Sequence, residues 1–237
     1  MKFKLIESFL QEELFKAHET LNPVLWQNGK LKQNVKDKIL ELIEEFQSTL
    51  DIPLIVLDIN LVGSNASYNY TDKSDVDVHI ITNYDDYGYP EELVQAALNS
   101  FKTNFNRRYD INYEGYNVEI YVEDIKSSPQ SNGIYSILKD KWIKKPQKLK
   151  TVEIELEPVL SNNIEMVQNA LDSNSVKQVE EAINNLYILR RESLVAEGEF
   201  GVGNLVFKKI RNEGLLDALK DKKVELASEE LSIWNLS

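Results

Sequence analysis

The chain has 237 residues, and its 27 Lys and Arg against 39 Asp and Glu give a formal net charge of −12. Hydrophobic content of 42% and charged content of 28% exclude wholesale disorder, and the absence of cysteine excludes disulfides, thiolate metal sites and a cysteine nucleophile. No apolar run approaches the ~18 residues of a membrane span, and the N-terminal MKFKLIESFLQEEL reaches acidic residues too early for a secretory signal. We therefore expect a soluble cytoplasmic protein without a membrane partner.

The negative charge is concentrated in the middle of the chain. Residues 51–125 hold 4 basic and 14 acidic residues, whereas residues 126–150 hold 7 basic residues and one acidic residue. A net negative charge disfavours long duplex DNA as a partner. The acidic middle is expected if carboxylates gather to hold metal ions, and a solvated acidic surface is the alternative interpretation.

Hydrophobic periodicity predicts alternating helices and strands in the first half. We expect helices over 2–16, 31–50 and 90–106, strands over 54–62 and 75–82, and a polar loop after Gly63-Ser64. The buried face of the 90–106 helix is predicted from spacing to comprise Leu93, Ala97, Phe101 and Phe105.

The second half begins as a hairpin and becomes helical. Segments 109–113 and 116–122 predict a hairpin around Glu114-Gly115, and GIYSILKDKWIKK predicts a short helix or helix-like turn. Helical spacing continues over 160–195, with a break at DSNS and an N-cap at Ser175, and over 204–221, with a break near Gly214. The predicted fold is α+β: a small mixed β-sheet flanked by helices over residues 1–150, and a helical region over 151–237.

The strand over 75–82 carries the strongest chemical signal. Side chains alternate along a strand, so Asp75 and Asp77 project from one face, while Val76 and Val78 project from the other. Two neighbouring carboxylates repel each other unless a cation neutralises them, and all-oxygen ligands suit Mg²⁺. Glu119 occupies the polar face of the strand over 116–122. If the two strands are neighbours, three carboxylates converge, and such a set can hold two Mg²⁺ ions for phosphoryl or nucleotidyl transfer.

Gly63-Ser64 ends the preceding strand. Glycine lets a backbone approach a phosphate closely, and serine adds a hydroxyl and an amide donor. A lone Gly-Ser or a lone Asp-x-Asp is a weak signal. The ordered set is more specific: an apolar strand, Gly-Ser, a ten-residue gap, Asp-Val-Asp-Val, and a later Val-Glu-Ile.

The segment GSNASYNYTDKSDVDVH resembles the signature of the DNA polymerase β-type nucleotidyltransferase superfamily. The chain also resembles predicted nucleotidyltransferases of bacteriophages, which would place it in the host cytoplasm. That likeness covers most of residues 20–150, through LNPVLWQNGKLKQNVKDKILELIEEF, the GS–DVDVH segment, VEIYVED and GIYSILKDKWIKKP.

The resemblance implies a role for each motif residue. Gly63 and Ser64 would hold the triphosphate, and Asp75 and Asp77 would ligate two Mg²⁺ or Mn²⁺ ions. Glu119 would be the third metal ligand and would help to activate the attacking hydroxyl. The superfamily usually has Asp at this third position, so the longer Glu119 side chain is a departure. Glu123 and Asp124 are the alternatives for this third acid, although we favour their interpretation as exposed loop acids.

Further candidates surround this set. Ser74 is a candidate phosphate contact, and Tyr135 and Ser136 are candidate nucleotide contacts because relatives build their pocket there. His79 shares the face of the two aspartates and is predicted either to touch substrate or to hydrogen-bond within the site. The lysines of 139–150, Arg190-Arg191 and Lys208-Lys209 are interpreted either as an anion-binding surface or as solvated residues.

Three functions fit these residues. The first is a metal-dependent nucleotidyltransferase that moves an NMP from an NTP, for which we take ATP, to a hydroxyl of an RNA end, a protein or a small molecule. The second is a binding module that holds a nucleotide or partner without turnover. The third is a two-metal nuclease, which the Gly-Ser placement disfavours.

Overall fold

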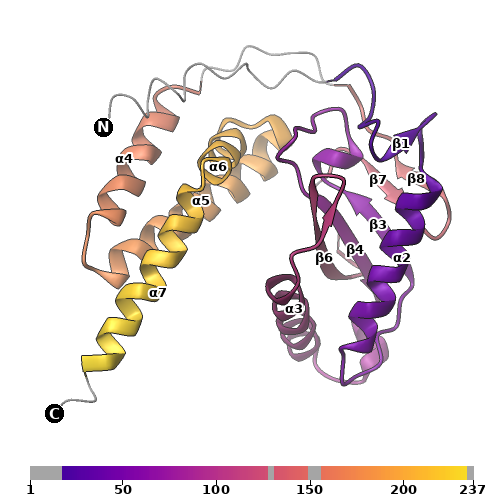
Figure 1. Cartoon of the computed structure of the whole chain (residues 1–237), viewed down its shortest axis with the longest axis horizontal. Coiled ribbons are helices and arrows are strands. Elements are labelled where there is room, and N and C mark those ends of the chain that lie inside the picture. Colours follow the sequence, from indigo (N-terminus) through magenta and orange to yellow (C-terminus); the bar gives the residue numbers. More distant parts are fainter. Residues whose placement is uncertain (1–17, 128–130, 149–155, 234–237) are drawn as a thin grey trace. The chain divides into compact units, whose positions relative to one another are not determined.

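The computed structural model of the chain describes residues 18–127, 131–148 and 156–233. These residues form two compact units, one within Phe15–Thr151 and the other within Val152–Ser237. The first unit combines a small mixed β-sheet with helices, and the second is helical, so the fold is α+β as expected (Figure 1). The helix predicted over 2–16 lies outside the described residues.

Six strands form the main sheet of the first unit, in the spatial order β5-β6-β4-β3-β7-β8. Within it, β4 and β6 pair in parallel and the other neighbours pair antiparallel. A parallel pair needs a long crossover connection, which here contains helix α3 (Glu91–Arg108). The strands are β3 (Asp58–Val62), β4 (Val76–Thr82), β5 (Asn112–Tyr113), β6 (Tyr116–Asp124), β7 (Ile134–Ser136) and β8 (Lys141–Lys144).

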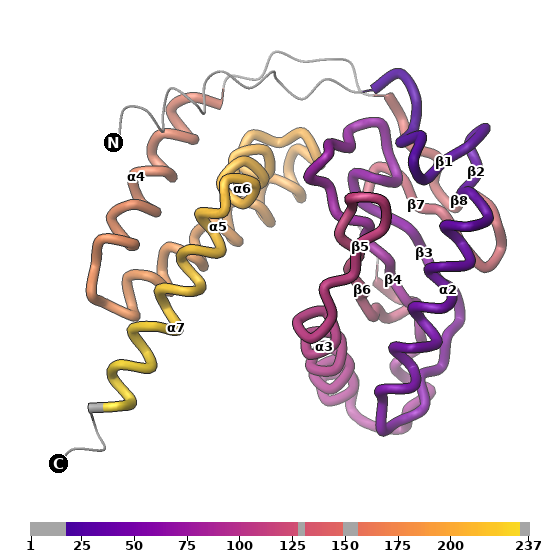
Figure 2. Tube along the Cα trace, viewed as in Figure 1, coloured from indigo at the N-terminus to yellow at the C-terminus, as the bar shows by residue number. Residues whose placement is uncertain are grey.

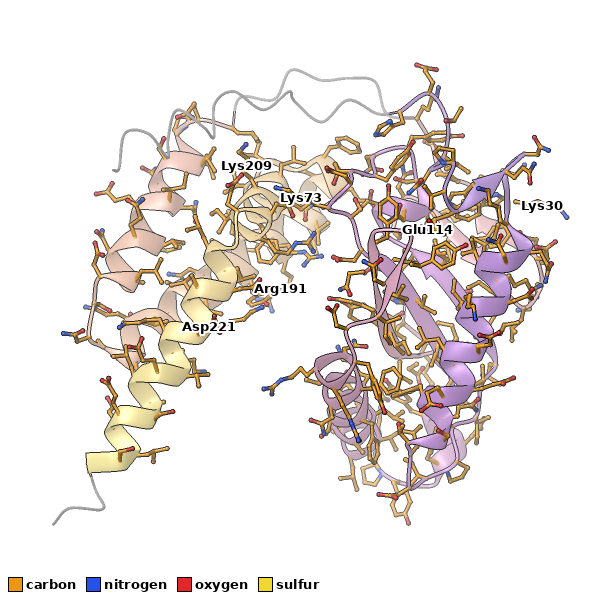
Figure 3. The ribbon with its side chains drawn as sticks, viewed as in Figure 1. Lys30, Lys73, Glu114, Arg191, Lys209 and Asp221 are labelled. Carbon is orange, nitrogen blue, oxygen red and sulfur yellow. The ribbon has the colours of Figure 1, made fainter. Side chains whose placement is uncertain are left out.

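The strands predicted from alternation are confirmed, although β3 begins at Asp58 rather than at residue 54. The β5–β6 turn has positive φ at both Glu114 (50°) and Gly115 (93°), as a two-residue hairpin turn favours (Figure 2). Glu114 stands at its tip (Figure 3). A smaller hairpin, β1 (Trp26–Gln27) and β2 (Lys30–Leu31), turns in the same way at Asn28-Gly29.

The helix predicted over GIYSILKDKWIKK is wrong, because this segment forms the antiparallel pair β7–β8. Its aromatic residues explain the difference. The rings of Trp142 and Trp26 stack with centroids 4.7 Å apart, and Tyr135 meets both rings edge-on at 5.0 Å. This contact between distant segments outweighs local helix propensity, which is a weak determinant on its own.

One face of the sheet packs against α2 (Gln33–Ser48) and α3 in a single hydrophobic core. Phe46 of α2 meets Phe105 of α3 edge-on at 5.1 Å. The predicted buried face of α3 is wrong by one position at its start, where Val94 and Leu98 are buried and Leu93 is 57% exposed. The strands contribute β-branched residues to this core: Ile59, Val76, Val78, Ile80, Val118, Ile120 and Val122.

The helical unit has a separate core. It consists of α4 (Val159–Leu171), α5 (Val176–Glu197), α6 (Val202–Asn212) and α7 (Leu215–Ile233). The predicted breaks are confirmed, and the Ser175 side chain caps α5 by accepting a 3.3 Å hydrogen bond from Gln178 N. None of the helices in the described residues is long and apolar enough to span a bilayer.

Asn106 of α3 ties the crossover helix to the outer edge of β6. Its Oδ1 accepts from Ile120 N at 3.1 Å, and its Nδ2 donates to Ile120 O at 2.9 Å. Since β5 pairs only with Tyr116 and Asn117, these bonds satisfy backbone groups of β6 beyond the hairpin.

We expect Asn106→Ala to lower the free energy of unfolding by about 1–3 kcal/mol, because it leaves two part-buried backbone groups without their partner. Chemical denaturation of the full chain measures this loss. The matched control is Asn104→Ala on the exposed face of α3, for which we expect a change within about 0.5 kcal/mol. Equal effects of the two substitutions would contradict this role of Asn106.

Candidate active site

The candidate site lies on the face of the sheet opposite α2 and α3. Paired residues of neighbouring strands share a face, and alternate residues along each strand belong to it. This polar face is made by the central strands β3, β4 and β6. Its residues are Asp58, Asn60, Val62, Asp77, His79, Ile81, Glu119, Tyr121 and Glu123.

Asp77 is the centre of the predicted catalytic set. It pairs with Glu119 of β6 on one side and with Val62 of β3 on the other. The strands of the two acids are therefore neighbours, as the carboxylate prediction requires. Asp75, two residues before Asp77, immediately precedes β4, and all three acids are half-buried. Strand pairing holds the backbones of Asp77 and Glu119 side by side.

Gly63 lies directly against Asp77. Its φ of +74° is disfavoured for other residues, and a Cβ at this position would stand 2.0 Å from Asp77 Oδ2. Its N–H donates to Ser131 Oγ at 3.1 Å, so this amide already has a hydrogen-bond acceptor within the protein. Close approach of the backbone to the carboxylate, rather than turn formation alone, is why glycine is needed here.

The 3₁₀ helix η1 (Ser64–Ala66) follows Gly63. The first N–H groups of such a turn have no acceptor within it, so they are suited to an anion. Ser64 is half-buried at this end. The predicted phosphate-binding turn and the predicted metal-binding acids are thus adjacent in space.

Asn65 connects this turn to the acid strand, and the sequence reasoning missed it. Its Nδ2 donates to Asp75 O at 3.0 Å and to Ser74 O at 3.3 Å, and its Oδ1 accepts from Asn22 Nδ2 at 2.8 Å. Trp26 Nε1 donates to Asn65 O at 2.7 Å. The side chain is fully buried. Its only sequence signal is its position directly after Gly-Ser.

Ser74, a predicted phosphate contact, is only 6% exposed and shapes the loop instead. Its Oγ accepts a 2.9 Å hydrogen bond from Thr71 N. Lys73, beside it, is exposed in the same loop (Figure 3). The structure thus assigns Ser74 a contact within its own turn.

The structure does not bring Tyr135, a predicted nucleotide contact, to the polar face. It pairs with Leu61 of β3, whose side chain points into the core, and it is 1% exposed. Its hydroxyl donates to Asp140 Oδ1 at 2.7 Å, and burial raises the pKa of Tyr135 to about 12. The ring is therefore a packing residue between Trp26 and Trp142.

Ser136 does lie on the polar face, opposite Asn60, but it is fully buried. Its Oγ donates to Asp58 Oδ1 at 2.7 Å, and Lys139 Nζ pairs with Asp58 Oδ2 at 2.7 Å. These bonds neutralise a carboxylate that is itself only 5% exposed. Ser136, which was predicted as a nucleotide contact, thus stabilises the first residue of β3, Asp58.

Other lysines of the 139–150 strip also have partners within the protein. Lys144 Nζ donates to Ser131 O at 2.6 Å, and Lys148 pairs with Glu19. The contacts of Lys139, Lys144 and Lys148 weaken the interpretation of the strip as a phosphate-binding surface.

In the helical unit, the Arg190 guanidinium lies 4.8 Å from the centre of the Phe207 ring, whereas Arg191 is exposed on α5 (Figure 3).

The Glu119 carboxylate accepts a short hydrogen bond from the Tyr121 hydroxyl, two residues along the same strand. Among the described residues, no group of three or more Asp, Glu, His or Cys side chains has the arrangement of a metal site. The carboxylate oxygens of Asp75 and Asp77 fit a hard cation such as Mg²⁺, and the Gly63 backbone lies against Asp77.

Glu123 and Asp124 are wrongly interpreted as exposed loop acids, because both belong to β6. Asp124 is 4% exposed and accepts from Tyr84 N at 2.8 Å and Lys126 N at 2.6 Å. Glu123 lies on the polar face, with Oε1 3.0 Å from His79 Nδ1. Its position two residues beyond Tyr121 in an alternating strand was the signal for this pairing.

Comparison with known proteins adds no relative. No family model, curated protein or solved structure matches the chain.

We expect Gly63→Ala to destabilise the chain more than a glycine substitution at the same backbone conformation does. Gly198→Ala is the matched control, because Gly198 has nearly the same backbone angles (φ 76°, ψ −159°, against φ 74°, ψ −161° at Gly63) but open space around its Cβ position. Strain alone costs about 1–3 kcal/mol at either site, and the contact with Asp77 adds to it only at Gly63. Denaturant unfolding measures both losses. Equal losses would show that Gly63 is needed only for its backbone conformation.

Proposed function

We propose that the chain is a metal-dependent nucleotidyltransferase with a polymerase β-like core. It moves an NMP from an NTP, for which we take ATP, to an acceptor hydroxyl and releases pyrophosphate. The observation that carries this proposal is the position of Asp77, which has the Gly63 backbone against its carboxylate and Glu119 beside it on the next strand. A triphosphate-binding turn and metal-binding acids at one place are what nucleotidyl transfer requires.

Each residue has a distinct part in this proposal. Asp75 and Asp77 would hold the metal ions, and Ser64 with the first N–H groups of η1 would orient the triphosphate. Bound Mg²⁺ or Mn²⁺ would offset phosphate charge and lower the pKa of the attacking hydroxyl. Glu119 would accept the hydroxyl proton as the oxygen attacks the α-phosphorus and pyrophosphate leaves. This role requires Glu119 to leave its bond with Tyr121.

The acceptor is a hydroxyl of an RNA end, a protein or a small molecule. The net charge of −12 disfavours long duplex DNA, because a polyanion is repelled at long range. An NTP is not disfavoured in the same way, since metal ions would offset the acids that surround it.

A binding module without turnover is the second candidate. The observation that favours it is the Tyr121–Glu119 bond, which engages the third carboxylate. This candidate predicts nucleotide binding without transfer to any acceptor.

We expect joint Asp75→Asn and Asp77→Asn substitution to reduce transfer at least about 100-fold, because the charge that holds the metal is removed. The assay follows α-labelled NTPs and pyrophosphate release, with Mg²⁺ or Mn²⁺ and pools of RNA, protein and small-molecule acceptors. The matched control is joint Asp85→Asn and Asp86→Asn, which removes the same charge from an exposed turn.

Transfer that survives the Asp75 and Asp77 substitutions would overturn the proposal, and so would an equal loss in the control. Binding of a non-hydrolysable NTP without metal, and with no transfer to any pool, would favour the binding module instead.

A further inference from the structure

Three buried polar atoms on the sheet have no hydrogen-bond partner among the described residues: Asn60 Oδ1, His79 Nδ1 and Glu123 Oε2. They come from the adjacent strands β3, β4 and β6, and their side chains share the polar face. Asn60 is 6% exposed, and the His79 side chain is 13% exposed. A buried polar atom without a partner costs about 1–3 kcal/mol, so a group of three needs an explanation.

The three side chains are close enough to share one ligand. Asn60 and His79 are direct partners across β3 and β4, which brings their Cβ atoms to within about 4.5–5.5 Å. His79 Nδ1 and Glu123 Oε1 are 3.0 Å apart, yet Nδ1 lacks the geometry of a hydrogen bond. Two ligands of one ion, each about 2.0–2.2 Å from it, stand about 3 Å apart, which is the separation seen here.

The surrounding charges favour a cation. His79 is the only partner that the described ion pairs give to Glu123, and it is charged only when protonated. The Nζ of Lys102, on α3, lies 4.5 Å from the centre of the Tyr121 ring. Tyr121 in turn lies beside His79, with ring centroids 4.8 Å apart. Thus a half-buried carboxylate faces an imidazole and a carboxamide.

We propose that Asn60, His79 and Glu123 form a second cation site, selective for a divalent ion that accepts imidazole, with Zn²⁺ as the best fit. Imidazole, carboxylate and carboxamide donors suit Zn²⁺, Co²⁺ and Mn²⁺, whereas Mg²⁺ prefers oxygen alone. The site lies two residues along β4 from Asp77, so it is separate from the aspartate pair. Three protein ligands leave a position open for water or a ligand oxygen. This inference does not rest on the proposed function.

The test is calorimetric titration of the metal-free full chain with Zn²⁺, in the Asp75→Asn and Asp77→Asn background that removes the aspartate pair. We expect one ion per chain in this background. His79→Gln or Glu123→Gln should weaken binding at least about 100-fold, since each removes a direct ligand. His18→Gln is the matched control, because His18 is the other histidine of the chain and its Nε2 is 2.9 Å from Tyr70 O. It should bind Zn²⁺ normally.

Asn60→Asp supplies a second test, with an expected result that a purely structural role of Asn60 would not produce. A carboxylate in place of the carboxamide should tighten Zn²⁺ binding about 10-fold and make thermal stability depend on Zn²⁺. Circular dichroism of each metal-free variant confirms folding before titration.

Three results would overturn the proposal. The first is absence of Zn²⁺ binding, which would assign the three atoms to a bridging water. The second is Zn²⁺ binding that is unchanged by His79→Gln. The third is a loss of Zn²⁺ affinity in His18→Gln equal to that in His79→Gln. None of these results depends on nucleotide turnover, so failure here is distinguishable from failure of the nucleotidyltransferase assignment.

Discussion

The parallel pairing of β4 with β6 is the constraint on which the candidate site depends. It sets Asp77 beside Glu119 and His79 beside Tyr121, although each pair is separated by 42 residues of chain. The crossover helix α3 makes the pairing possible, and Asn106 fixes that helix to the backbone of β6. A slip of one residue would turn the acids into the hydrophobic core. The core residues that alternate with them therefore also specify the site.

Carboxylates placed side by side repel each other, so the polar face needs support from its surroundings. At the far end of β3, Lys139 and Ser136 neutralise and hold Asp58. At the other end, Asn65 binds the backbone of Asp75, and Asn22 and Trp26 bind Asn65. These bonds stabilise both ends of the face and leave its centre to Asp77, Glu119 and His79. The supporting residues lie before the 63–79 segment (Asn22 and Trp26), within it (Asn65) and after it (Ser136 and Lys139).

Sequence periodicity predicted the elements whose side chains alternate strictly. The strands that carry Asp77 and Glu119, and the positive-φ turn at Glu114-Gly115, follow from residue type alone. Sequence periodicity did not predict β7–β8. The stacking of Trp26 on Trp142 stabilises this pair of strands, and a contact between such distant residues leaves no pattern in the local sequence. The start of the buried face of α3 was wrong for a similar reason, since the sheet beneath it determines which side is covered.

The site shows the same division. Asp75, Asp77 and Gly63 could be proposed from the sequence because their signal is the spacing within one strand and one turn. The contacts of Asn65, and the pairing of His79 with Glu123, join residues on different elements. Tyr135 was predicted as a nucleotide contact from its place after the third acid. Its strand pairing instead turns the ring into the core, beside Leu61.

We propose that Asp75 and Asp77 bind catalytic metal beside a triphosphate held at Gly63-Ser64. Crystals of the full chain with Mn²⁺ and a non-hydrolysable NTP test this proposal directly, because the anomalous signal of Mn²⁺ locates each ion. We expect Mn²⁺ on the two aspartates, with the triphosphate against η1 and the Glu119 carboxylate released from Tyr121. Nucleotide bound elsewhere, or Mn²⁺ absent from both aspartates while nucleotide is present, would contradict it.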